Sequence, residues 1–271
     1  MALHNRIPDT GQLVPGSEQH LRLFTRQDRK QDFFRPLARR GVVDHFHDFG
    51  TQAAASLTDY FAVANAAGAG AANFVVTTDA ENGIARGNTG TTDDGSISLI
   101  SPIILFGDRN CFVQGRFLLD VVTGVSFEFG LIDAVPAANG PGVSDIDTPA
   151  FTAADCALLH MDTDQTLTTM AFATNGSTAG QPDQKTNLAA PSILTPVAAT
   201  YVTCEIRLIG NNASCFVQSA NGGFFETKHA FDAQGHTEGG VALAVWVYVR
   251  TRNTTAKVPD IDYLWFGQDR N

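Results

Sequence analysis

From Val43 onward, the chain alternates short apolar segments with clusters of Gly, Asn, Asp and Pro. In many of these segments every second residue is apolar, which is the period of a half-buried β-strand. Such segments begin near residues 73, 96, 111, 157, 170 and 261, and long amphipathic helical patterns are absent. The pattern predicts an all-β fold, a two-sheet antiparallel β-sandwich whose sheets bury their inner faces against each other.

The clearest strand pattern is YVTCEIRLIGNNASCFVQ, which begins at Tyr201. Apolar positions alternate from Val202 to Leu208, and the GNN run that follows tolerates the positive φ of a tight turn. A turn centred on residues 210–211 or 211–212 puts Cys204 and Cys215 on the same face. The sequence predicts a hairpin whose two cysteines face the core, and a cytoplasmic origin makes a disulfide the less favoured outcome.

Two segments indicate the centre of the sandwich. FEFGL places Phe127, Phe129 and Leu131 on one strand face, whereas VALAVWVYVR, from Val241, is apolar on both faces. A strand that is apolar on both faces lies in the middle of a sheet and is covered on both sides.

Three aromatic residues on apolar strands could contact a glycan by stacking or meet a neighbouring subunit: Trp246, Tyr248 and Trp265. Their positions favour packing in the sandwich or between subunits. Two long loops, from Ala134 and from Asn175, exceed the usual length of connections and would form a binding edge or pack on a neighbour.

Residues 1–42 form a separate segment, an extended N-terminal arm before the sandwich domain of residues 43–271. Up to Gly41 the arm has eight Lys or Arg and four acids, a net of 8 − 4 = +4, so the remainder carries −10 − 4 = −14. This asymmetry suggests a tether to an acidic surface, the alternative being a solvated tail. Nucleic acid could contact the arm only, because phosphate repels an acidic body. The arm cations proposed to bind a partner are Arg22, Arg26, Arg29, Lys30, Arg35, Arg39 and Arg40.

No catalytic or cofactor-binding constellation is present. The Glu-x-Asp-x-x-Glu motif of sandwich glycoside hydrolases does not occur, and in the nearest approach, EFGLID, Glu128 and Asp133 are five apart and point to opposite strand faces. Acidic clusters in DIDTPAFTAAD and MDTDQT lack calcium-loop spacing, so solvated turn aspartates are the favoured interpretation. No apolar run reaches the ~20 residues of a membrane span, and the N-terminus lacks a signal-peptide core. We expect a soluble non-enzymatic protein without cofactor or membrane contact.

The segment VDHFHDFG contains two histidines on one face of a strand. Asp44 and Asp48 share the opposite face with Phe46, so they cannot join His45 and His47 around a metal ion. We expect a first strand beside the closing strand IDYLWF, with Phe46 turned into the core, both histidines outward and no metal site.

Read together, VDHFHDFG, the Gly/Ala-rich LTDYFAVANAAGAGAANFVV, the Thr-Gly turn region, FEFGLIDA and the closing KVPDIDYLWFGQDR resemble one family. The sequence is similar to the concanavalin A-like (lectin/glucanase superfamily) jelly-roll structural proteins of tailed bacteriophages, over residues 43–271. The resemblance implies a two-sheet jelly roll in a virion, assembled in the host cytoplasm. The metal-binding loop of the family's carbohydrate-binding members does not align, so lectin activity is not carried over.

The sequence therefore predicts a non-enzymatic virion structural protein, a capsid decoration or cement protein anchored through its arm. The expected partners are the major capsid protein or neighbouring virion subunits, with a homo-oligomer such as a trimer. The alternative is a glycan-binding, lectin-like module of a tail or head fibre used in host adhesion.

Overall fold

The computed structural model describes residues 42–47, 49, 57, 61, 67–77, 83–102, 105–134, 136, 140–145, 150–165, 170–176, 184–187, 197–218, 224–230 and 241–269. In the first half of the chain these residues form β1 (Val42–His47), β2 (Ala72–Thr77), β3 (Ile84–Asn88), β4 (Ser96–Ile100), β5 (Leu105–Phe106), the 3-10 helix η4 (Gly107–Arg109), β6 (Phe112–Leu119) and β7 (Val125–Ile132). The second half adds β8 (Val143–Asp145), β9 (Ala150–Phe151), β10 (Cys156–Asp162), β11 (Ala171–Asn175), β12 (Gln184–Asn187), β13 (Val202–Ile209), β14 (Asn212–Gln218), β15 (Phe224–Ala230), β16 (Ala242–Thr251) and β17 (Pro259–Asp269). Among the described residues, no helix has the length and apolarity of a membrane span.

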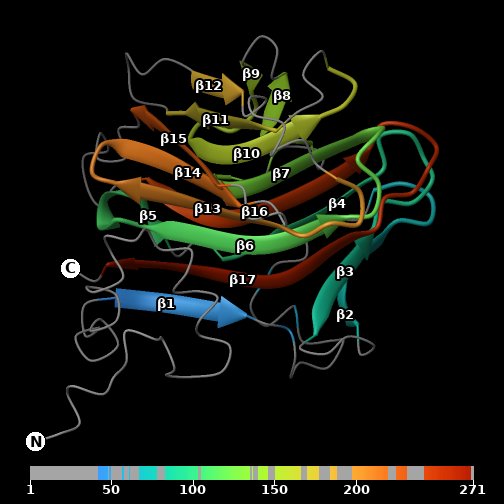
Figure 1. Cartoon of the computed structure of the whole chain (residues 1–271), viewed down its shortest axis with the longest axis horizontal. Helices are drawn as coiled ribbons and strands as arrows, with labels where there is room; N and C mark the ends of the chain where they lie inside the picture. Colours follow the sequence, from blue (N-terminus) through green and yellow to red (C-terminus); the bar gives the residue numbers. More distant parts are fainter. Residues whose placement is uncertain are drawn as a thin grey trace, which may run out of the picture. The chain divides into compact units, whose positions relative to one another are not determined.

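The strands form two large sheets (Figure 1). The eight-stranded sheet has the order β15-β14-β13-β6-β17-β3-β2, with β1 also paired to β17. The seven-stranded sheet has the order β12-β11-β10-β7-β16-β4, with β5 also paired to β16. Strands far apart in sequence are neighbours in both sheets, and the fold is the predicted two-sheet β-sandwich. The arm of residues 1–41, with its seven proposed partner-binding cations, lies outside the described residues.

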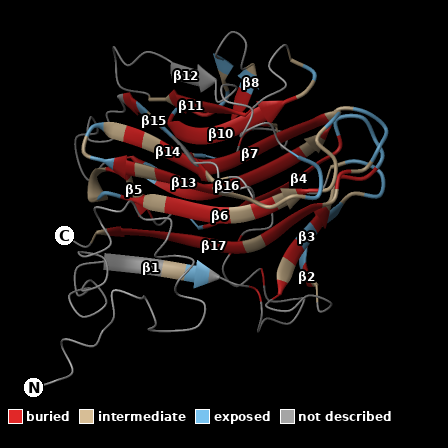
Figure 2. Ribbon diagram, viewed as in Figure 1, coloured by how far each residue is buried: buried red, intermediate tan, exposed pale blue. Residues whose placement is uncertain are grey.

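The core lies between the two sheets. Phe117 of β6 meets Phe127 and Phe129 of β7, with ring centroids 4.4 and 5.6 Å apart. Figure 2 shows that β7 and β16, at the centre of the seven-stranded sheet, are buried almost throughout, whereas β6 of the other sheet also has partly exposed positions. Phe127, Phe129 and Leu131 are all buried in this core, which confirms the inner face predicted from FEFGL.

The predicted hairpin is β13–β14. Ile209 stands opposite Asn212, so the turn is centred on Gly210 and Asn211, the first of the two alternatives. Cys204 and Cys215 both belong to the core cluster, as predicted. All four cysteines are free and buried.

Strand β16 lies between β7 and β4 and is buried on both faces, as its sequence predicts. Leu243, Val245 and Val247 face the core between the sheets. Trp246 and Tyr248 occupy the opposite, outer face, where they belong to a second buried cluster. This outer face forms the candidate site described below.

The first strand differs from prediction in orientation. As expected, β1 pairs with the closing strand β17. However, Phe46 is 46% exposed and lies against Tyr263, whereas His45 stacks on the core residue Phe266 at 5.3 Å. The prediction that Phe46 faces the core and His45 faces outward is therefore wrong. Alternation fixes which residues share a face but not which face is buried. The side chains of Asp44, His47 and Asp48 lie outside the described ones.

Six strands occur where the sequence pattern does not predict them. Strands β8, β9 and β12 lie within the two long segments that the sequence presents as loops, β3 and β15 carry weak alternation, and β5 has only two residues. Short strands such as β9 have too few residues for a period to be recognised. One of these unexpected elements, the β8–β9 pair, covers the candidate site.

Candidate functional site

A row of polar side chains crosses the outer face of the seven-stranded sheet. In the strand registers His160 of β10 stands opposite Glu128 of β7, which stands opposite Tyr248 of β16, which stands opposite Ser98 of β4. All four are at most 1% exposed. An outer sheet face that meets solvent would leave such residues accessible, so this face is covered.

The cover is a segment that we call the strap, residues 140–145 and 150–155, which includes β8 and β9. Val143 and Ala153 of the strap pack in one apolar cluster with Ile132, Trp246 and Tyr248 of the sheet. Within the strap, the Thr152 N–H donates to the Gly142 carbonyl at 2.9 Å. The strap therefore covers the sheet face through the apolar cluster and is held together by its own backbone hydrogen bond.

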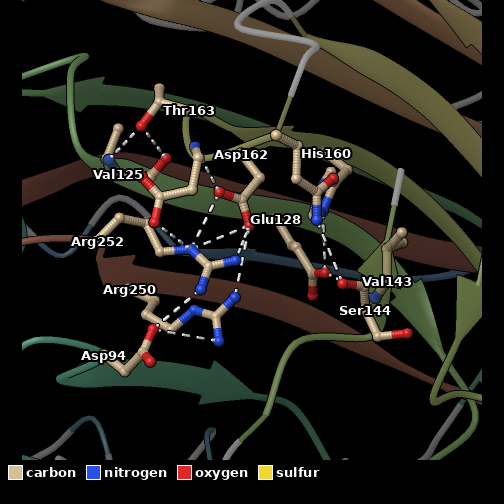
Figure 3. Close-up of polar contacts among 12 residues, drawn as sticks. Asp94, Val125, Glu128, Val143, Ser144, His160, Asp162, Thr163, Arg250 and Arg252 are labelled. Atoms are coloured by element: carbon tan, nitrogen blue, oxygen red, sulfur yellow. Dashed lines mark hydrogen bonds and ion pairs between the residues drawn. The ribbon is translucent and has the colours of Figure 1, made fainter. Parts of the chain in front are cut away.

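Glu128 joins the strap to the sheet (Figure 3). Its Oε2 accepts hydrogen bonds from the Gly142 N–H at 2.7 Å and from the Trp246 indole N–H at 2.8 Å. Its Oε1 accepts from the Val143 N–H at 2.8 Å and contacts His160 Nδ1 at 3.1 Å. A carboxylate offers about four acceptor positions, so this group is fully used.

His160 provides the fourth contact of the Glu128 carboxylate, and its own Nε2 atom has no hydrogen-bond partner. An ionised carboxylate only accepts hydrogen bonds, so the proton of a neutral imidazole belongs on Nδ1. Nε2 of His160 is then an acceptor, and it is buried with no hydrogen-bond partner. On the other side of Glu128, burial raises the pKa of Tyr248 to about 12, with the charge of Glu128 adding to the effect, so the phenol stays protonated at neutral pH.

The strap passes close to the sheet at Gly142. A Cβ atom on Gly142 would lie 2.8 Å from Cδ1 of Leu158 and 3.3 Å from Oε2 of Glu128. A side chain at this position would require these neighbouring side chains to shift. The absence of a side chain at Gly142 thus suits the close approach of the strap backbone.

A second polar cluster lies beside the row, at the ends of β10 and β16 (Figure 3). Arg252 donates to both carboxylate oxygens of Asp162 and, at 3.0 Å, to Asp94. Arg250 adds a longer contact to Asp162 at 3.5 Å. Burial lowers the pKa of Arg252, but Asp162 and Asp94 together raise it above its ordinary value. These ion pairs connect the ends of β10 and β16, and both Arg250 and Arg252 have an acidic partner.

The arrangement does not fit glycoside hydrolysis. A hydrolase places two carboxyl groups on either side of an accessible scissile bond. Glu128 is fully buried beneath the strap, and the register of β7 with both neighbours runs unbroken to Ile132. Asp133 follows the end of the strand, and burial raises the pKa of its carboxyl group. Glu128 therefore holds the strap through its hydrogen bonds from Gly142 and Val143.

The predicted aromatic contact residues are all buried. Trp246 and Tyr248 lie side by side under the strap, their rings stacked with centroids 5.7 Å apart. Trp265 lies on the outer face of the other sheet, 6% exposed and edge-on to Phe112. The structure therefore brings two of the three together, and their burial argues against direct contact with a glycan or a neighbouring subunit.

Sequence reasoning singled out Glu128 but missed His160 and the strap. His160 lies in ALLHM, which the pattern shows as an ordinary strand. Its partner becomes visible only when β10 and β7 are aligned in register. No local signal marks residues 140–145 as a cover. Among the described residues, no group of three or more metal-ligating side chains occurs.

Comparison with known proteins identifies the fold. No family model and no curated protein sequence matches the chain. Among solved structures, the Lotus tetragonolobus seed lectin has a TM-score of 0.56 and 11% identity over 84% of this chain and 100% of the lectin. The Bacteroides ovatus mixed linkage glucan PUL GH16 protein has a TM-score of 0.51 and 13% identity over 82% and 99%. The CBM2 module of the evolved Dit of Lactobacillus casei BL23 phage J-1 has a TM-score of 0.51 and 13% identity over 85% and 97%.

These similarities extend over most of the described body but are low in sequence identity, so they concern architecture and not activity. Lectins, a glucan-active family and a phage module share this arrangement of strands. The chain has the concanavalin A-like β-sandwich fold.

Proposed function

We propose that this protein is a non-enzymatic virion structural protein, a capsid decoration protein whose sandwich body is displayed while its N-terminal arm anchors it. The arm would contact the major capsid protein or a neighbouring virion subunit. The body would add contact area and form homo-oligomers on the particle.

The proposal that the protein is not an enzyme rests on the covered outer face of the seven-stranded sheet. Glu128 is 0% exposed and accepts hydrogen bonds from the strap itself. A substrate could reach this carboxylate only if the strap left, which would uncover the apolar cluster of Trp246 and Tyr248. Burial of that cluster opposes such an opening.

Two further observations support a place on a particle. The arm carries a net +4 and the rest of the chain −14, so the arm suits an acidic partner surface and the body does not. In addition, a module of a phage protein, the Dit of phage J-1, has the same fold.

Mass spectrometry of purified particles tests the location, and deletion of residues 1–41 tests the anchor. We expect the full chain to co-sediment with particles that lack it, and the truncated chain to be lost from them. Raising the salt concentration should weaken binding of the full chain, because exposed charge pairs are screened. Equal binding by both forms would refute the anchoring role.

Point variants separate the charge of the arm from its length. Replacing Lys30 by Gln should reduce particle binding, whereas Lys228→Gln, which removes the same charge, should not. Lys228 is an exposed cation on β15 and provides the matched control in the body. A reduction that is equal in both variants would show that total charge, not the arm, governs binding.

A second function, glycan binding at a tail or head fibre, is favoured by the shared fold with a seed lectin and with a CBM2 module. The binding edge would be formed by the loops that begin at Ala134 and Asn175. A glycan array, with and without calcium, separates this function from the first. Specific hits that survive deletion of residues 1–41 would favour it, and an empty array would count against it.

A further inference from the structure

The β13–β14 hairpin brings two thiols together in the core. Sγ of Cys204 and Sγ of Cys215 are 3.8 Å apart. In the hairpin register Cys204 stands opposite Val217 and Cys215 opposite Ile206, so the two cysteines occupy a diagonal pair on the inner face. Both are 0% exposed.

The other two cysteines provide an internal comparison. Cys111 precedes β6 and Cys156 begins β10, and both are buried like the hairpin pair. Neither has a described thiol contact of the kind that joins Cys204 to Cys215. Burial is therefore common to all four cysteines, and proximity distinguishes one pair.

We propose that Cys204 and Cys215 form an oxidation-sensitive pair that closes into an intramolecular disulfide when the protein meets a peroxide. One thiol loses its proton and its sulfur attacks a peroxide oxygen, which breaks the O–O bond, gives a sulfenic acid and releases one water. The second thiol then displaces the hydroxyl group from that sulfur, which forms the S–S bond and releases a second water. The two sulfurs supply the two electrons that reduce the peroxide.

The two sulfur atoms must move closer together to form the product. The sulfur atoms must approach by about 1.8 Å, from 3.8 Å to the ~2.05 Å of an S–S bond. Rotation of the two cysteine side chains can supply part of this movement, and the strands that carry them are already paired. Whichever cysteine is oxidised first, the thiol of the other lies next to it. A neighbouring thiol of this kind converts a sulfenic acid into a disulfide.

The reaction should be slow in the folded protein. Burial raises the pKa of the Cys204 thiol well above its ordinary value, and the neighbouring Cys215 adds to the effect. The thiolate, which is the reactive form, is then scarce. A small neutral oxidant such as hydrogen peroxide suits this site better than a bulky disulfide, because it needs less opening of the hairpin.

Peptide mapping tests the pair directly on the full chain. The native protein is incubated with hydrogen peroxide, its remaining thiols are alkylated, and it is digested with trypsin without reduction. Trypsin cuts after Lys185, Arg207 and Lys228, so Cys204 falls in peptide 186–207 and Cys215 in peptide 208–228. We expect these two peptides to appear joined and two hydrogens lighter than their sum, while the Cys111 peptide remains alkylated.

Two serine variants complete the test. Cys204→Ser should abolish the joined species and leave Cys215 open to further oxidation, whereas Cys111→Ser should leave the joined species unchanged. Circular dichroism confirms that each variant is folded. Native protein whose Cys204 and Cys215 stay alkylatable, or joined peptides that involve Cys111 or Cys156 instead, would overturn the proposal. This chemistry depends only on the hairpin and would stand if the virion role failed.

Discussion

Replacing Glu128 by Gln tests whether this carboxylate holds the strap on the sheet. The change removes the charge and turns one acceptor oxygen into a donor NH₂ group, with almost no change in size. The best placement keeps the amide oxygen where Oε2 accepts from Gly142 and Trp246. The new NH₂ group then faces His160, which can accept by changing tautomer, and the Val143 N–H, which cannot.

The expected cost is set first by the Val143 N–H, which loses its acceptor. A buried donor left without a partner costs ~1–3 kcal/mol, so Glu128→Gln should lower the free energy of unfolding by about 2 kcal/mol. For a domain of this size that corresponds to a fall in Tm of roughly 4–8 °C. Glu128→Ala leaves the Gly142 and Val143 N–H groups and the Trp246 indole unsatisfied, and should cost about 4 kcal/mol.

Guanidinium denaturation followed by tryptophan fluorescence measures both effects, because Trp246 contacts the altered carboxylate. Glu226→Gln is the matched control, since Glu226 is an exposed glutamate on β15 and its replacement should change stability by less than about 0.5 kcal/mol. Equal stability of the Glu128→Gln and Glu226→Gln variants would refute the anchoring role of Glu128. So would a Glu128→Ala variant as stable as the unaltered chain.

Two further predictions concern other parts of the sandwich. Burial lowers the pKa of His229 to about 4 from its ordinary 6.5, where its Nδ1 lies 2.9 Å from Thr174 Oγ1 of the other sheet. The unfolded chain therefore binds this proton more tightly than the folded chain does. Stability should be complete above pH 6.5, fall as the pH drops and level off below about 4, with a total loss of roughly 3 kcal/mol. Denaturation of the His229→Gln variant at several pH values should give a flatter curve, and parallel curves would contradict this. Gly130→Ala should cost more than about 3 kcal/mol, because φ is +154° and the new Cβ would lie 2.2 Å from the Ala157 carbonyl oxygen. Gly210→Ala should cost only about 1 kcal/mol, because φ is +56° and the space around the new Cβ is open. If the two variants lowered Tm equally, the contact between the new Cβ at position 130 and the Ala157 carbonyl oxygen would not be the source of the cost.

The fold class and much of the core follow from the alternation of apolar and polar residues along the chain. Alternation over β13 and β14 predicted the hairpin, its turn and the inward direction of both cysteines, because a period of two leaves only two faces to choose from. In β16 the absence of polar positions on either face predicted a central strand. These inferences held because each rests on a local pattern, which the residues of one strand or one hairpin contain completely.

The candidate site, in contrast, arises from contacts between strands that are distant in the sequence. Glu128, His160, Trp246 and the strap are brought together by the strand order β10-β7-β16 and by the hydrogen bonds from Gly142 and Val143 of the strap. Strand order and register depend on contacts between distant segments, which a local pattern does not encode. The same reason explains the error at β1: alternation grouped His45 apart from Phe46, but pairing with β17 decided that His45 lies on the core side. The alternation within each strand therefore predicts the sandwich. The buried environment of Glu128 forms only when β10, β16 and the strap are packed around β7.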